Sequence, residues 1–240
     1  MSPSRSVLVE AGRLEGWLAR FEVRNGPFSA QPVAERADGS IAVAAANGCT
    51  AVLTPALPPG ILPPPAAPPG TDAGTPDTTE EGAAQGVRLA GELLSAVDPA
   101  GTVGILLIRR GGYSVGVARA GRILASKTGT RYVQGRTAAG GWSQQRFARR
   151  RANQADALVE ETAVRAAALF GAHPPACLQL GGDRLLATGT LGEPALAPFA
   201  RLPQVPFLTV PDPRFTVLED AARTALAVRI TVTDPPGGTR

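Results

Sequence analysis

The sequence is poor in the residues that build metal centres and thiol chemistry. Its 240 residues include two cysteines far apart, Cys49 and Cys177, and a single histidine, His173. A structural zinc site needs clustered cysteine or histidine ligands, and a disulfide framework needs several cysteine pairs. We therefore expect no metal and no small-molecule cofactor. A Ser-His-Asp or Cys-His catalytic arrangement would have to use His173, which follows a predicted helix.

Long hydrophobic runs are also missing. No apolar segment approaches the roughly 18 to 20 residues that a membrane span requires. Glu10 and Arg13 stand where a signal peptide would carry its apolar core. These absences predict a cytoplasmic protein without a membrane partner. The chain is long enough to bury the core of one domain, or slightly more, without disulfides.

Acidic residues are absent from one long stretch. Residues 99–155 contain eleven basic residues and no acidic one, whereas the rest of the chain contains 13 basic and 20 acidic residues. The stretch therefore carries a charge of +11 and the remainder a charge of −7. Such asymmetry indicates a surface that binds a polyanion, RNA or DNA. The alternative is a solvated surface whose counter-charges come from elsewhere in the fold.

The first part of the chain predicts a small helical and antiparallel element. In residues 11–24, four large apolar residues recur at helical spacing: Leu14, Trp17, Leu18 and Phe21. Three short strands, separated by Asp-Gly and Asn-Gly turn dipeptides, are predicted at 33–35, 41–44 and 51–53. Nine of the 22 residues at 55–76 are proline, which predicts a loop or linker. A second amphipathic helix is predicted at 84–97.

The second part predicts strands first and an alternation of strands and helices afterwards. The first strands are expected at 103–108, 113–118 and 122–126, with a fourth at 130–134. A long helix is expected over 143–170, with a buried face of Ala155, Leu158, Val159, Thr162, Ala163, Ala166 and Leu169. Later elements are a strand at 176–180, a helix at 183–186, a strand at 207–210, a helix at 217–225 and a strand at 227–233. This order predicts an α+β fold with helices packed on a mixed β-sheet.

These patterns divide the chain into four parts. Residues 1–54 form the N-terminal helix and small antiparallel element, and residues 55–80 form the proline-rich loop or linker. Residues 81–235 form the main domain, and residues 236–240 form a tail.

The junction before the long helix combines glycine, glutamine and arginine. Gly140 and Gly141 leave the backbone without side chains, and Gln144 and Gln145 follow. Four arginines then occupy the first helical turns, where the helix macrodipole disfavours cations by roughly 0.3–1 kcal/mol each: Arg146, Arg149, Arg150 and Arg151. They are therefore placed for an external anion such as a phosphate. The alternative is a simple turn with Ser143 as the helix N-cap.

A second glycine pair follows a predicted strand at Gly181, Gly182 and Asp183. It could cradle a phosphate, but it lacks the spacing of the known phosphate-binding glycine motifs. Asp183 as a helix N-cap is the simpler interpretation.

Residues 103–151 resemble the catalytic middle domain of archaeal and eukaryotic peptide release factors, and most closely the actinobacterial branch of the Vms-like release factors. The resemblance extends over about residues 100–235 and implies an RNase H-like core. In release factors the glutamine follows the two glycines directly, whereas here Trp142 and Ser143 intervene. Vms-like members carry a small residue and then glutamine, which Ser143 and Gln144 match. The resemblance thus implies a catalytic role for Gln144, with Gly140, Gly141 and Ser143. Gln145 is the alternative.

The implied activity is that of a peptidyl-tRNA hydrolase in ribosome-associated quality control. The partners would be the large ribosomal subunit and peptidyl-tRNA, and the protein would be a monomer. RNA contacts would come from Lys127, Arg131, Arg136, Trp142, Arg146, Arg149, Arg150 and Arg151. Two alternatives remain: a nuclease that cuts the tRNA near its 3′ end, using the RNA 2′-hydroxyl, and a non-catalytic ribosome-binding or RNA-binding factor.

Overall fold

The computed structural model describes residues 4–58, 88, 101–130 and 142–235, and for residues 142–152 it describes the course of the backbone. The chain divides into two compact units, the first comprising 1–100 and 226–240 and the second 101–225. Most of the proline-rich segment and of the predicted helix at 84–97 lies outside the described residues, as do residues 131–134 of the possible fourth strand and the tail.

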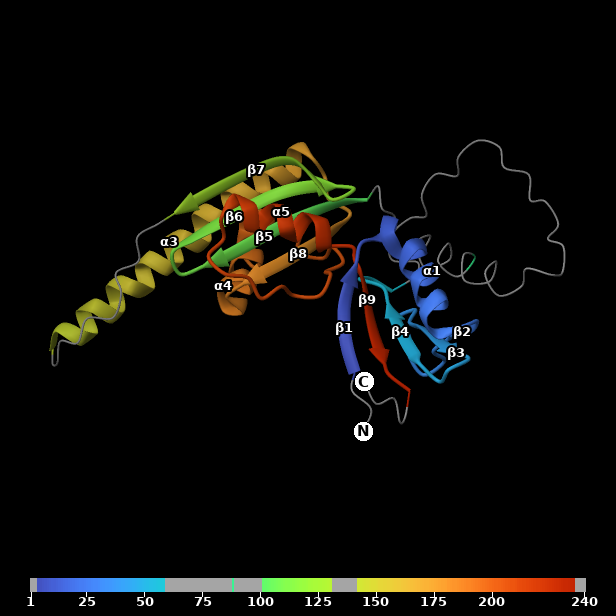
Figure 1. Ribbon diagram of the computed structural model, residues 1–240. Coiled ribbons are helices and arrows are strands. Elements are labelled where there is room, and N and C mark those ends of the chain that lie inside the picture. The colour runs from blue at the N-terminus through green and yellow to red at the C-terminus, as the bar shows by residue number, and fades with distance from the viewer. Residues whose placement is uncertain (1–3, 59–87, 89–100, 131–141, 236–240) are drawn as a thin grey trace. The chain divides into compact units, whose positions relative to one another are not determined.

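The first unit is a five-stranded antiparallel sheet with one helix on its face (Figure 1). The helix α1 (Leu14–Asn25), preceded by a short turn of 3-10 helix at Ala11–Arg13, buries Leu14, Leu18 and Phe21, as its spacing predicts. Trp17 is partly buried and stacks on Phe21. The strand order is β1 (Ser4–Val9), β9 (Val228–Thr233), β4 (Thr50–Thr54), β3 (Ile41–Ala45) and β2 (Phe28–Pro32).

Two strands of this sheet differ from the sequence prediction. The strand predicted at 33–35 is wrong, because that segment forms turns and the strand is β2, which ends at Pro32. β2 lies at the edge of the sheet, where a proline costs no hydrogen bond between strands. β1 was not predicted. β9 was predicted as a strand, but it pairs with β1 and β4 and so belongs to this sheet, not to that of the second unit.

The second unit contains a four-stranded mixed sheet. Its order is β7 (Arg122–Thr130), β6 (Gly112–Arg119), β5 (Thr102–Arg109) and β8 (Cys177–Gly182). β5, β6 and β7 form the predicted antiparallel meander, and β8 is parallel to β5. The long helix α3 (Trp142–Ala172) lies between β7 and β8 in the chain. The prediction of an α+β fold with helices on a mixed sheet is thus confirmed.

Helices cover both faces of this sheet (Figure 1). Leu106 of β5 and Val115 of β6 belong to the core under α3 and α4 (Arg184–Leu191). On the opposite face, α5 (Phe215–Thr224) packs against β5, β6 and β7. The close packing is seen at Gly116 of β6, where a Cβ atom added to the glycine would lie 3.0 Å from the side chain of Leu218 of α5. β5 is buried on both faces, which explains its almost continuous apolar sequence.

The buried face of α3 largely follows the prediction. Leu158, Thr162, Ala163 and Ala166 are buried, whereas Phe170 is a further core residue that the prediction omitted. The other predicted positions are half-buried: Ala155, Val159 and Leu169. The predicted strand at 207–210 is wrong, because this segment makes only an isolated bridge through Leu208 to Gly181 of β8.

Candidate functional site

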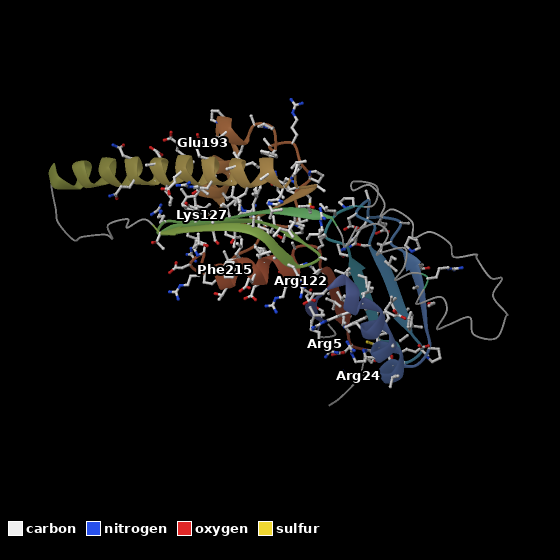
Figure 2. The ribbon with its side chains drawn as sticks, turned by 90° about the horizontal axis from the view of Figure 1, so that it is seen from above. Arg5, Arg24, Arg122, Lys127, Glu193 and Phe215 are labelled. Atoms are coloured by element: carbon white, nitrogen blue, oxygen red, sulfur yellow. The ribbon has the colours of Figure 1, made fainter. Side chains whose placement is uncertain are left out.

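One end of the second unit's sheet gathers the start of α3 and the ends of three strands. β6 is antiparallel to both β5 and β7, and β8 is parallel to β5, so three strands end on the same side, at Arg109, Thr130 and Gly182. The start of α3 lies at this side and projects beyond the sheet (Figures 1 and 2). We call this side the α3 end of the sheet.

The first part of α3 contains the residues of the glutamine motif. The helix begins at Trp142, so Ser143 and Gln144 lie in its first turn. The first described buried side chain of α3 is Leu158, and at 1.5 Å per residue it lies about 24 Å along the helix from Trp142. The glutamine is therefore carried at the tip of a projecting helix. Gly140, Gly141, Arg131 and Arg136 lie outside the described residues.

Arginines follow the glutamine along the same helix. Arg146, Arg149 and Arg150 occur at spacings of three and four, which places their positions on one side of α3, and Arg151 comes next. The first turn contains no acidic residue. The positive end of the macrodipole and the arginines therefore act together, and a bound anion would be stabilised by both.

Lys127 is the predicted RNA-binding residue on β7. It pairs with Val115 of β6, so it lies on the face of the sheet that α3 covers, and its side chain is exposed. Figure 2 shows Lys127 toward the α3 end and Arg122 at the opposite end of the unit. Lys127 therefore lies on the face and at the end from which α3 projects.

A hydrogen bond between Tyr113 and Glu161 joins the sheet to α3. The Tyr113 hydroxyl donates to Glu161 Oε1 at 3.2 Å, and the tyrosine side chain is 2% exposed. Burial, with a smaller contribution from the Glu161 charge, raises the pKa of Tyr113, so it remains a donor near neutral pH. A Cβ on Gly129 would lie 2.5 Å from the tyrosine ring, so glycine is needed there. The hydrogen bond therefore connects β6 to α3 at Glu161.

This contact could be predicted only in part from local sequence. No positioning role was predicted for Tyr113 or for Glu161. Glycine inside a strand, as at Gly129, marks a close approach of another group. Gly129 was therefore visible in the sequence as a sign of close packing. The hydrogen bond between Tyr113 and Glu161, which are 48 residues apart, has no such sign.

The second glycine pair has a structural explanation. The Asp183 side chain accepts hydrogen bonds from the backbone N–H groups of Leu185 and Leu186, at 3.0 and 3.2 Å, so it is the N-cap of α4. Gly182 has a φ of 98°, and a Cβ there would lie 2.2 Å from the carbonyl oxygen of Ile108. The simpler of the two predicted interpretations is confirmed, since strand packing fills the space beside the glycine.

The single histidine lies far from the glutamine. His173 is exposed just beyond the last residue of α3, about 43 Å along the helix axis from Gln144. Within the described residues, no group of three or more histidine, cysteine or acidic side chains is arranged to hold a metal ion. A general base from His173 therefore cannot act at the start of α3.

The cysteines are buried thiols. Cys177 is 1% exposed, and burial raises its pKa to about 12. We expect alkylation of Cys177 at pH 8 to be about a thousandfold slower in the folded protein than in denaturant, because the thiolate is the reacting form. Mass spectrometry of the alkylated peptide measures both rates. Equal rates in the two conditions would contradict the buried position.

Residues 101–231, more than half of the chain, match the family model described as the Actinobacteria/chloroflexi VLRF1 release factor. The chain belongs to this family. The match covers the whole second unit and continues into β9. It confirms the Vms-like family assignment and gives the protein a release-factor role in translation. The chain matches no curated protein. None of the helices in the described ranges combines the length and apolar character that crossing a membrane requires.

Proposed function

We propose that this VLRF1 family member is a peptidyl-tRNA hydrolase that acts on stalled large-subunit complexes. The observation that carries the proposal is the release-factor match over a segment that contains Gly140, Gly141 and Gln144. The projecting start of α3 supports it (Figure 1), because the ester of peptidyl-tRNA lies outside this protein and must be reached by an extended element. In this proposal the protein acts as a monomer in the cytoplasm, during ribosome-associated quality control.

The reaction is attack of water on the ester between the nascent peptide and the 3′-terminal ribose. A bond forms between the water oxygen and the ester carbonyl carbon, and the bond to the ribose oxygen breaks. One water proton goes to the leaving ribose oxygen, so the products are a peptide carboxylic acid and a tRNA with a free hydroxyl. The acid then ionises in water.

Gln144 contributes geometry to this reaction. An amide side chain cannot accept a proton near neutral pH, so its role is to hold the water in line with the carbonyl carbon. Gly140 and Gly141 let the backbone approach the ester closely, since they carry no side chain. Ser143 is the small residue before the glutamine, and Trp142 stacks on a base or ribose of the tRNA end.

The basic residues hold the RNA. Guanidinium groups bind phosphates through paired hydrogen bonds, and each neutralised phosphate releases counterions. The proposed contacts are Lys127, Arg131, Arg136, Arg146, Arg149, Arg150 and Arg151. The order β7-β6-β5-β8, with an antiparallel meander followed by a helix and a parallel strand, supports the RNase H-like core.

The direct test uses large subunits that carry peptidyl-tRNA labelled in the peptide. The purified protein is expected to release free peptide with repeated turnover, whereas buffer alone releases little. Puromycin, added to a separate sample, checks that the substrate is competent for release. Puromycin-reactive complexes that bind the protein and keep their peptide would contradict hydrolysis and favour a non-catalytic binding factor.

Changing Arg149, Arg150 and Arg151 together to alanine is expected to weaken binding to large subunits. If each arginine neutralises one phosphate, the slope of log affinity against log salt falls by about 2. The control is a triple alanine variant at Arg20, Arg24 and Arg36, three exposed arginines of the first unit that remove the same charge. Equal slopes for the two triple variants would exclude a phosphate clamp on α3.

A further inference from the structure

We propose that four arginines at the ends of strands and the starts of helices, all at the α3 end, form a second RNA-backbone contact, separate from the start of α3. This arginine surface consists of Arg109, Arg110, Arg184 and Arg214, all of them exposed. None of them was singled out from the sequence as a site residue. The inference rests on the proposed function for the identity of the partner as RNA, but it does not depend on ester hydrolysis.

Hydrogen bonds join the three segments that carry these arginines: the end of β5, the β8–α4 junction and the loop before α5. Arg109 is the last residue of β5, and its Nη1 group donates to the carbonyl oxygen of Val210, in the loop before α5, at 3.0 Å. The junction of β8 and α4 lies against the same end of β5, because the backbone N–H of Asp183 donates to the carbonyl oxygen of Ile108 at 2.8 Å. Segments up to about 100 residues apart in sequence thus lie side by side at the α3 end.

This surface keeps an excess of positive charge within the described part of the chain. Two acidic residues lie in the same segments, Asp183 and Asp212, and the carboxylate of Asp183 is engaged as the N-cap of α4. Among the described residues, Arg110, Arg184 and Arg214 form no ion pair with a carboxylate. The second unit has sixteen basic and eight acidic residues, a net charge of +8, and the first unit has a net charge of −4.

Two aromatic side chains beside the arginines favour RNA as the partner of this surface. The Arg184 guanidinium lies over the Phe207 ring at 4.2 Å from its centroid, which limits the freedom that the arginine would lose on binding. Phe215 follows Arg214 directly, is 46% exposed and offers a ring on which a base can stack (Figure 2). Arginine forks with exposed aromatic rings match phosphates and bases. The same end of the sheet carries the start of α3, so one RNA can contact both.

The test removes two charges for which the described part of the chain shows no hydrogen bond or ion pair of the side chain. Arg110 and Arg214 are exposed, and no side-chain hydrogen bond to either is found among the described residues. The variant Arg110→Gln with Arg214→Gln is compared with Arg122→Gln with Arg201→Gln. The control arginines are also exposed, and they lie at the opposite end, at the first residue of β7 and beside the start of β8. Both variants lose the same charge.

The probe is a labelled single-stranded RNA of 20 nucleotides, titrated with the full chain over a series of salt concentrations. The first variant is expected to bind about tenfold more weakly, with a salt slope lower by about 1.4, because single-stranded RNA contributes about 0.7 per phosphate contact. The control variant is expected to keep the parent slope. Equal behaviour of the two variants would overturn the proposal. Arg110→Glu alone gives the same comparison should the double variant fail to fold.

Polyglutamate is titrated in parallel as an acidic polypeptide. Loss of polyglutamate binding in the first variant, with RNA binding intact, would overturn the RNA assignment in favour of an acidic protein partner. The outcome is independent of peptide release. A protein that shows the expected RNA slopes but releases no peptide would refute the hydrolase and leave the arginine surface standing.

Discussion

Gln144→Ala is expected to lower the rate of peptide release from large-subunit complexes by about a hundredfold or more, with little change in binding. The expected size is that of losing one group that positions a reactant or stabilises the transition state. Binding persists because the arginines, and not the glutamine, hold the RNA. Single-turnover release and a separate binding titration measure the two effects.

Gln145→Ala is the matched control. The two glutamines are neighbours in the first turns of α3, and consecutive helical residues differ by about 100° around the axis, so a substrate that meets one side chain does not meet the other in the same way. Release by Gln145→Ala is expected to stay within about threefold of the parent. The reverse pattern would assign the catalytic role to Gln145, and parent-like release by both variants would exclude a glutamine mechanism.

Gly182→Ala is expected to lower the free energy of unfolding by about 3 kcal/mol. The residue has a φ of 98°, where alanine is strained, and its added Cβ would lie 2.2 Å from the carbonyl oxygen of Ile108. Strain and overpacking each cost about 1–3 kcal/mol. The backbone cannot yield easily, because the N–H of the next residue, Asp183, donates to that same carbonyl.

Gly189→Ala serves as the control for this substitution. Gly189 lies in α4, and nothing lies within 4 Å of its added Cβ, so alanine is expected to stabilise the helix by about 0.5–1 kcal/mol. Denaturant unfolding of the three proteins measures the differences. A Gly182→Ala protein as stable as the parent would contradict the close contact between Gly182 and the carbonyl oxygen of Ile108.

Much of the fold could be predicted from local patterns. The apolar spacing of Leu14, Leu18 and Phe21 marked α1, and the alternation of strands and glycine turns marked the β5–β7 meander. Both signals act over a few residues, so they can be read along the chain. The same holds for the length of α3, which the prediction placed within two residues at either end.

Pairing over long distances could not be predicted. The residue pattern of β9 predicts an extended strand. It does not predict that this strand pairs with β1 and β4, which both precede it by more than 170 residues in the chain. β2 was not predicted as a strand, because it contains Pro32 and polar residues. Conversely, the apolar segment 207–210 resembles a strand, although its position beside β8 allows it one isolated bridge.

The candidate site shows the same limit. Gly140, Gln144 and the arginines that follow are contiguous, so their combination was visible in the sequence. The Tyr113–Glu161 contact and the arginine surface each join residues from separate segments. Neither could be predicted from a short stretch of sequence, because only the folded chain brings these segments together.

Ester hydrolysis and tRNA cleavage are distinguished by examining both products of one reaction. Large subunits carrying peptidyl-tRNA are mixed with the protein, and the peptide and the tRNA 3′ end are resolved together over time. Ester hydrolysis predicts that free peptide and full-length tRNA with an intact 3′-terminal adenosine appear at the same rate. A tRNA shortened at its 3′ end, with the missing nucleotides still attached to the peptide, would contradict the account and establish a nuclease.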